Sequence, residues 1–482
     1  MVFSLKRHLC ILLLATWLTG CIAPAATATT TPSPAPTPTP MPVNGAPGIG
    51  DSYYPDLGNG GYDVQNYILN LTIDPPANTL TGSAIIQATA TEYLSSFDLD
   101  FHGLTVDSIT VNGETVTSSR NADELIITPS KPLDVNKLFE VVVTYHGSPA
   151  LMPSQPIPVS MGWSHADNGA INIWGEPDAA SSWFPNNNHP RDKATYRFEI
   201  TVPKPWMVAA SGSLKDTKAY GDKTTFIWEM NKPMASYLAS INIDNYELFT
   251  QSGPHGISIR DYYPADYSLA HRVQFNILPA AIAFFEKLFS PYPFAEYGVL
   301  IATKEGVCQE SEMALEAQTL SIHCPSEFMA TEGVIVHELA HMWFGDSVSL
   351  KNWQDIWLKE GFATYAEWLW ASKNDPVAIN QIAKNNRARF FDDPNFSVAK
   401  PAPQNLYTDE SYTGGALVLQ ALRLEVGDET FFKILRTYAE RYKYENAGTA
   451  DFIAVAKEVS GKNLDSFFDN WLFNKEMPQL PN

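Results

Sequence analysis

The sequence predicts an α+β protein with two folded domains, an antiparallel β domain followed by a mainly helical domain. Between about residues 53 and 248, short runs alternate apolar and polar side chains with a period of two, and Gly, Pro, Asn and Asp separate them. Beyond about residue 252 the apolar period becomes that of an α-helix. A chain of 482 residues with 45% hydrophobic side chains is long enough to bury a core in each domain.

The composition narrows the class of function. The formal net charge is −21 and no basic stripe is visible, which argues against a nucleic-acid partner, because phosphate binding needs clustered Lys and Arg. Only four cysteines occur, and Cys10 and Cys21 both lie in the first few dozen residues. The folded part is therefore not a disulfide scaffold.

The first residues predict a targeting segment. Lys6 and Arg7 precede an apolar run at residues 9–18 that is too short to span a bilayer. The run continues into Leu-Thr-Gly-Cys, which ends at Cys21 and resembles the lipobox of bacterial lipoproteins. The resemblance implies a signal peptide at residues 1–20, lipidation of Cys21 and an extracytoplasmic protein anchored to a bacterial membrane. The alternative is a plain secretory signal cleaved a few residues later, which also leads out of the cytoplasm.

A tether is expected after this signal. Residues 21–50 are rich in Thr, Pro and Ala, a composition that builds no core and favours the extended polyproline II conformation. At about 3.1 Å per residue, the segment can hold the next domain roughly 80 Å from a membrane. We expect the β domain at residues 51–252 and the helical domain at residues 253–482.

Two local signals mark elements within these domains. Asn112 and Gly113 form the Asn-Gly pair that is typical of a tight hairpin turn. The apolar pattern at residues 268–288 predicts one long helix, which stops before Ser-Pro-Tyr-Pro.

A metal site is predicted in the helical domain. His337 and His341 are four residues apart and therefore lie on one face of a helix, where neutral imidazoles bind one ion. Glu338 projects beside them, close enough to act on a bound water. A catalytic zinc site has three protein ligands and one open position. Glu360, which lies among tryptophans and leucines, is the natural third ligand, because a buried carboxylate needs a partner.

The alternative to a metal site is a structural role for these polar residues. Two core histidines would then bond backbone carbonyls, and a carboxylate would pair with Lys359 or Arg387. The later glutamate favours the metal site over this alternative, because it completes a ligand set.

The segment from His337 to Glu360, with His-Glu-Leu-Ala-His at its start and Trp-Leu-Lys-Glu-Gly-Phe-Ala at its end, resembles the gluzincin metallopeptidases. Specifically it is similar to the aminopeptidase N family, as are Gly-Glu-Pro at residues 175–177 and Tyr-Thr-Gly-Gly at residues 412–415. The resemblance implies a saddle-like β domain, a thermolysin-like catalytic domain, one Zn²⁺ and peptide substrates with a free N-terminus. Many members add a large helical C-terminal domain, whereas this sequence stops at Asn482, which implies a two-domain form.

The resemblance also implies the roles of the site residues. The two histidines and Glu360 hold the zinc, which lowers the pKa of its water towards roughly 7 and polarises the scissile carbonyl. Glu338 is the general base. Tyr412 matches the tyrosine whose hydroxyl donates to the oxyanion, and Tyr407 is its rival if the alignment is shifted.

Two glutamates are implied to bind the α-ammonium group of the substrate by charge-assisted hydrogen bonds. They are Glu176 and Glu316, and the second stands in the place of the family's Gly-x-Met-Glu-Asn motif. Met313, Leu315 and Ala317 replace the Gly, Met and Asn of that motif. Losing the glycine removes backbone freedom, which leaves the side-chain preference of the first pocket open. The alternative is that both glutamates are surface acids of an acidic protein.

Further departures from the family lie beside these residues. Lys359 and Gly414 stand where the family often has Asn and Lys, and neither position supplies a ligand, so the implied mechanism is unchanged. Cys308 and Cys324 bracket Glu316. In an oxidising compartment a disulfide between them would contribute roughly 3 kcal/mol, and the sequence leaves its formation open.

Two other functions stay open at this point. A thermolysin-like endopeptidase would share the zinc ligands and the general base but would need no glutamates for an α-amine. A non-catalytic surface lipoprotein would bind peptides beside a vestigial metal site. The oligomeric state is not predicted.

Overall fold

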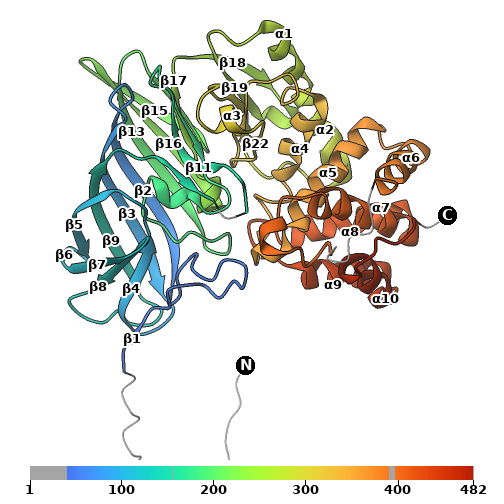
Figure 1. The fold of residues 1–482 in the computed structure, drawn as a ribbon, viewed down its shortest axis with the longest axis horizontal. Coiled ribbons are helices and arrows are strands. Elements are labelled where there is room, and N and C mark those ends of the chain that lie inside the picture. The colour runs from blue at the N-terminus through green and yellow to red at the C-terminus, as the bar shows by residue number, and fades with distance from the viewer. Residues whose placement is uncertain (1–40, 155, 390–396, 481–482) are drawn as a thin grey trace, which may run out of the picture. The chain divides into compact units, whose positions relative to one another are not determined.

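The structure is a computed structural model that describes residues 41–154, 156–389 and 397–480. The expected signal peptide, the lipidation of Cys21 and most of the tether lie outside the described residues. Figure 1 shows that strands gather in the N-terminal half and helices in the C-terminal half. The predicted α+β class, with the β domain first, is confirmed.

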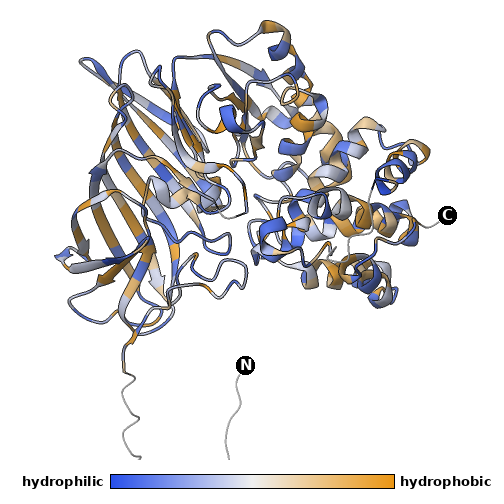
Figure 2. Cartoon of the chain, viewed as in Figure 1, coloured by the Kyte–Doolittle hydropathy of each residue, from blue (hydrophilic) through white to orange (hydrophobic). Residues whose placement is uncertain are grey.

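The largest sheet of the N-terminal half has eight strands. Burial alternates residue by residue along its central strands, so one face packs on the core, and Figure 2 shows the matching alternation of hydropathy. All neighbouring strands are antiparallel except β2 and β13, which run parallel. The order is β15 (Ser213–Tyr220), β16 (Lys223–Ala235), β13 (Lys193–Pro203), β2 (Tyr62–Asp74), β3 (Thr79–Ala90), β9 (Leu138–Gly147), β5 (Thr105–Val111), β6 (Glu114–Thr115).

The hairpin between β5 and β6 turns at the predicted Asn-Gly pair. Asn112 has φ 51° and Gly113 has φ 80°, and the two residues connect the paired Val111 and Glu114. Positive φ at both central positions is the requirement of the tight turn that fits twisted strands.

Two smaller sheets complete the N-terminal half. The first has the order β1 (Val43–Asn44), β4 (Leu94–Asp100), β8 (Glu124–Thr128), β7 (Thr117–Asn121). The second has the order β10 (Leu151–Pro153), β11 (Ser160–His165), β12 (Ile171–Trp174), β17 (Ile241–Asp244), β14 (Met207–Ala210). All four residues of β12 are buried, and the chain passes from its end directly to Glu176.

The C-terminal half has a sheet of its own. It begins with β18, which lies before the boundary expected at residue 253. Its order is β18 (Tyr246–Ser252), β19 (Ser258–Pro264), β21 (Val299–Ile301), β23 (Ser321–His323), β22 (Ala314–Leu315), with β20 (Glu296–Tyr297) beside β19. A further pair of strands joins β24 (Ser349–Leu350) to β25 (Asn446–Ala447).

Helices make up most of the remaining chain. They are α1 (Leu269–Arg272), α2 (Leu278–Leu288), α3 (Val307–Glu310), α4 (Glu332–His341), α5 (Trp357–Ala371), α6 (Pro376–Arg387), α7 (Gly415–Val426), α8 (Asp428–Arg441), α9 (Thr449–Ser460) and α10 (Asp465–Phe468). Within the described residues, none of them combines the length and the apolar character that crossing a bilayer requires.

The helical segment expected at residues 268–288 is present and ends at Leu288 as predicted, but it is not one continuous α-helix. A 3₁₀-helix at Val273–Ile277 separates α1 from α2. Pro279 lies in the first turn of α2, where a missing N–H costs nothing. Inside one continuous helix, its ring would clash with the carbonyl group four residues earlier.

Helices α5 and α7 pack closely against each other beside the candidate site. A Cβ atom on Gly361 would lie 2.6 Å from the Cα atom of Gly415, so the two glycines let the helix backbones touch. This contact brings Glu360 on α5 and Tyr412, just before α7, to one cavity.

Candidate active site

Three side chains from α4 and α5 converge on one point. Glu360 Oε2 lies 3.3 Å from His337 Nε2 and 3.5 Å from His341 Nε2. All three residues are buried, and one donor atom of each lies within 4.8 Å of the others. The structure thus brings together the residues that the sequence predicts as metal ligands.

Hydrogen bonds on the outer side of both imidazole rings orient them. His337 Nδ1 lies 2.7 Å from Glu367 Oε1, and His341 Nδ1 lies 3.1 Å from the carbonyl oxygen of Phe344. Because both partners are acceptors, Nδ1 carries the proton and Nε2 presents its lone pair to the centre of the site. Glu367 was not among the predicted site residues, although it follows Glu360 by two helical turns on the same face of α5.

Glu338 lines the same cavity, which has a volume of about 430 Å³. Burial raises the pKa of Glu338 to about 8, although the neighbouring His337 works against this shift. A carboxyl group with a pKa near neutrality both accepts and returns a proton, as a general base in peptide hydrolysis must.

Two tyrosines compete for the role of oxyanion donor. Tyr412 lies in a π-helical turn at Glu410–Gly414, and its ring stacks on that of His337 with centroids 5.9 Å apart. Tyr407 also lines the cavity, but its hydroxyl donates to Glu176 Oε1 at 3.0 Å. The geometry favours Tyr412, because the hydroxyl of Tyr407 is already engaged.

The two predicted amine-binding glutamates are buried and face the same cavity. Glu176 follows β12 of the N-terminal half, and Glu316 follows β22 of the C-terminal half. Neither residue is a surface acid. The cavity therefore draws its polar groups from both halves of the chain.

Lys359, considered above only as an ion-pair partner in the alternative to a metal site, lies at the centre of this carboxylate cluster. Its Nζ is 2.6 Å from Glu176 Oε1, 2.5 Å from Glu316 Oε1 and 2.7 Å from Glu360 Oε1. Burial alone would lower the pKa of Lys359, but these three carboxylates raise it above its ordinary value. Glu360 contacts Lys359 through Oε1 and the two histidines through Oε2. The ion pair with Lys359 therefore leaves Oε2 available as a metal ligand. Arg387 instead bonds backbone carbonyls near the C-terminal end.

A disulfide joins Cys308 to Cys324, with the two Cα atoms 5.4 Å apart. It closes the loop that carries Glu316 and Met313, and both of these residues line the cavity. The covalent link thus restrains the segment that presents Glu316.

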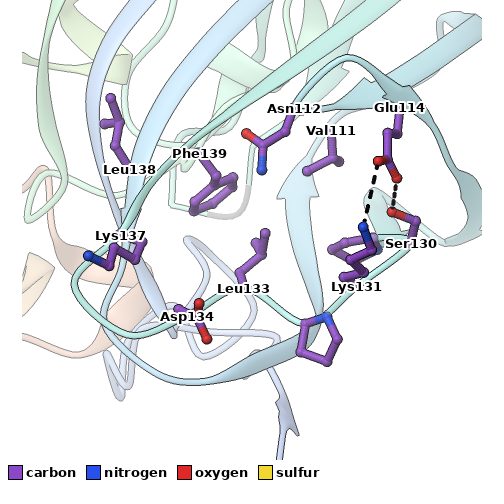
Figure 3. Close-up of a pocket in the computed structure, with 12 residues that line it drawn as sticks. Val111, Asn112, Glu114, Ser130, Lys131, Leu133, Asp134, Lys137, Leu138 and Phe139 are labelled. Atoms are coloured by element: carbon purple, nitrogen blue, oxygen red, sulfur yellow. Dashed lines mark hydrogen bonds and ion pairs between the residues drawn. The ribbon is translucent and has the colours of Figure 1, made fainter.

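Another cavity, of about 280 Å³, lies in the N-terminal half near the hairpin of β5 and β6 (Figure 3). Its Glu114 is engaged by Ser130 and by Lys131, as the dashed lines show. Neither of the two clusters of potential metal ligands found among the described residues lies there.

Comparison with known proteins gives zinc peptidases as relatives, in agreement with the predicted metal site. Residues 63–238 match the family model described as "Peptidase M1 N-terminal domain", and residues 273–471 match the "Peptidase family M1 domain". The crystal structure of an M1 zinc metallopeptidase from Deinococcus radiodurans is 30% identical, covers 90% of this chain and 99% of its own, and has a TM-score of 0.82. A mutant of that enzyme, bound to a Tyr-Ser-Ala substrate, aligns with a TM-score of 0.83 at the same identity and coverage.

Longer relatives match in part. Glutamyl aminopeptidase of Homo sapiens is 25% identical over 63% of this chain and 34% of its own length. Leucyl aminopeptidase of Saccharolobus solfataricus is 27% identical over 66% of this chain and 42% of its own length. The chain thus spans less than half the length of these curated relatives, whereas it spans nearly all of the Deinococcus radiodurans structure.

Proposed function

The chain belongs to the M1 family of zinc metallopeptidases, and from this premise we propose that it is an aminopeptidase that removes the N-terminal residue from peptides. The proposal rests on one cavity, in which a metal-ligand set, a buried general base and two carboxylates for an α-amine occur together.

The donor set suits one zinc ion. Two imidazole nitrogens and a carboxylate oxygen are the ligands of many catalytic zinc sites, and hydrogen bonds from the outer ring nitrogens fix the required tautomers. Zinc bound there supplies Lewis-acid chemistry, which lowers the pKa of water and polarises a carbonyl group.

The protein's own residues do the remaining work. Glu338 takes a proton from the attacking water and returns it to the departing amine. The hydroxyl of Tyr412 donates to the substrate oxygen on which negative charge develops. Glu176 and Glu316 accept hydrogen bonds from the α-ammonium group and so place the first peptide bond beside Glu338.

An extracytoplasmic, lipid-anchored location is also part of the proposal. Its support is the sequence alone: an apolar run at residues 9–18, the Leu-Thr-Gly-Cys that ends at Cys21, and the Thr/Pro/Ala-rich segment that follows.

Matched alanyl, leucyl and arginyl peptides, each with a free or an acetylated N-terminus, test the function. We expect cleavage of the free amines, loss of activity with a chelator and recovery with zinc. Equal cleavage of the acetylated peptides would replace this function with that of an endopeptidase. Binding of zinc without any cleavage would favour a peptide-binding protein.

A further inference from the structure

The ammonium group of Lys359 lies where the carboxylates of the amine subsite converge. An ammonium group has three N–H donors, and here three carboxylates stand within 2.7 Å of Nζ. The side chain is buried, so solvent hardly screens these ion pairs. Lys359 also lies 6.0 Å from the ring centroid of Tyr407.

The α-ammonium group of a peptide is chemically the same kind of donor. It carries three N–H groups and takes carboxylate acceptors by the same charge-assisted hydrogen bonds. Lys359 uses one oxygen of Glu176 and one of Glu316, and Tyr407 shares the first of these. The second oxygens of both glutamates have no hydrogen-bond partner among the described residues. They are the acceptors that remain for a substrate.

We propose that Lys359 is a specificity-determining residue of the amine subsite, an internal ammonium group that weakens the enzyme's selection for a charged N-terminus. The inference rests on the aminopeptidase function proposed above. Its direction follows from two electrostatic effects.

The first effect is repulsion between like charges. A substrate ammonium that shares Glu176 and Glu316 with Lys359 lies close to a second positive charge, in a site where the effective dielectric is well below that of water. The internal ammonium therefore weakens the binding of free-amine substrates.

The second effect concerns substrates without a charged N-terminus. Without Lys359, a blocked peptide would leave buried carboxylates unpaired, which is strongly unfavourable. With Lys359 in place, one positive charge already lies among the carboxylates before any substrate arrives, so a blocked peptide leaves less negative charge unpaired. The internal ammonium therefore makes the site more tolerant of blocked peptides.

The variant Lys359→Asn tests this proposal. The measured quantity is the ratio of kcat/KM for leucyl p-nitroanilide to kcat/KM for its N-acetyl form. We expect Lys359→Asn to raise this ratio about tenfold or more, mainly through a lower KM for the free amine, because repulsion is removed and the carboxylates need a cation. Calorimetric titration of the zinc-loaded protein with leucinamide reports on the same subsite without turnover, and its dissociation constant should fall by a similar factor.

Two control variants separate the local effect from a change in net charge. Lys351→Asn removes an equal charge from an ion pair with Asp451 outside the cavity and should leave the ratio unchanged. Lys359→Arg keeps a positive charge at the centre, so its ratio should lie closer to that of the wild type than the ratio of Lys359→Asn does. Zinc content and thermal unfolding are measured for each variant.

An unchanged or lower ratio in a folded, zinc-loaded Lys359→Asn protein would overturn the proposal. If Lys359→Asn does not fold, Lys359→Met makes the same comparison with a side chain of similar length. The wild type alone also tests the idea, since leucinamide should bind no more than about a hundredfold better than N-acetyl-leucinamide, and a larger difference contradicts it. Should the wild type cleave neither peptide, the proposed function fails, while the titrations still decide the role of Lys359.

Discussion

Glu338 and Glu360 are buried carboxylates in one cavity, but their surroundings differ. Burial works against the charge of Glu360, yet Lys359 and His341 hold its pKa well below the ordinary value. Glu338 has no such ion pair, and burial raises its pKa to about 8. The two environments favour different states: Glu360 stays ionised, whereas Glu338 can take up and release a proton near neutral pH.

Replacing Glu338, the proposed proton carrier, should therefore slow turnover strongly and leave the metal ligands intact. For Glu338→Gln we expect kcat to fall by about 10² to 10⁴, because Gln cannot accept the proton of the attacking water. Zinc content, measured by atomic spectroscopy, should stay at one ion per chain. Loss of zinc from this variant would show that Glu338 acts as a ligand instead.

The two tyrosines of the cavity should give different kinetic effects. Tyr412→Phe removes the proposed oxyanion donor and should lower kcat by about 10² to 10³ with little change in KM. Tyr407→Phe removes a hydrogen bond to Glu176 and should act mainly on KM for free-amine peptides. If the kcat effect appears in Tyr407→Phe instead, the two roles must be exchanged.

His323 should make stability depend on pH. It is buried between Ser321 Oγ and the carbonyl oxygen of Met329, and burial lowers its pKa to about 4. The unfolded chain, where the pKa of His is about 6.5, binds a proton that the folded chain excludes. Stability should thus fall by about 3 kcal/mol as the pH drops from about 6.5 to 4. Urea unfolding across this range should give a shallower dependence for His323→Gln, and equal slopes would contradict the prediction.

At the scale of elements, the contact of α5 with α7 controls where Glu360 lies. Gly361→Ala would place a Cβ atom 2.6 Å from Gly415 Cα, so the helices must separate. We expect the free energy of unfolding to fall by about 2 kcal/mol and zinc affinity to fall with it. Gly333→Ala in α4 is the matched control, because its nearest neighbour, Glu367 Oε2, lies at 3.5 Å. Both quantities should be nearly unchanged there, and equal losses in the two variants would refute the packing argument.

Elements that depend on local sequence could be predicted, whereas contacts between distant segments could not. The helical face of His337 and His341 follows from a spacing of four residues, which is local information. The hairpin at Asn112 is local in the same sense. By contrast, the ion pair of Lys359 with Glu176 joins the two halves of the chain, and no sequence pattern near either residue predicts it. The 3₁₀ stretch before α2 could have been predicted, because Pro279 lies inside the segment with a helical apolar period.

At the scale of the whole molecule, the N-terminal half is fastened to the catalytic half by buried polar contacts. Asp51 accepts a hydrogen bond from the backbone N–H of Trp353 at 2.7 Å and lies 3.0 Å from His189 Nε2. Lys193 on β13 donates to the carbonyl oxygens of Asp346 and Ser347, just beyond α4. These contacts join the half that carries Glu176 to the half that carries the helices of the site.

The proposed anchor is tested on the complete chain. Cys21→Ser removes the thiol that would carry the lipid, and we expect the protein to move from the membrane fraction to the soluble fraction of a bacterial host. Peptidase activity per molecule should be unaffected, because the candidate active-site cavity is lined by residues from Pro156 onwards. Equal membrane association of both proteins would rule out lipidation at this residue.

The division of the amine subsite between two sheets has a consequence for how such enzymes diversify. The predicted metal ligands belong to two adjacent helices, whereas the proposed recognition of a chain end also uses Glu176, which the N-terminal half supplies. The residues for hydrolysis and one of the residues for recognition of the N-terminus thus lie on different segments of the chain. If Glu176 has the proposed role, we expect changes confined to the loop after β12 to alter the balance between exopeptidase and endopeptidase activity while the catalytic helices stay as they are.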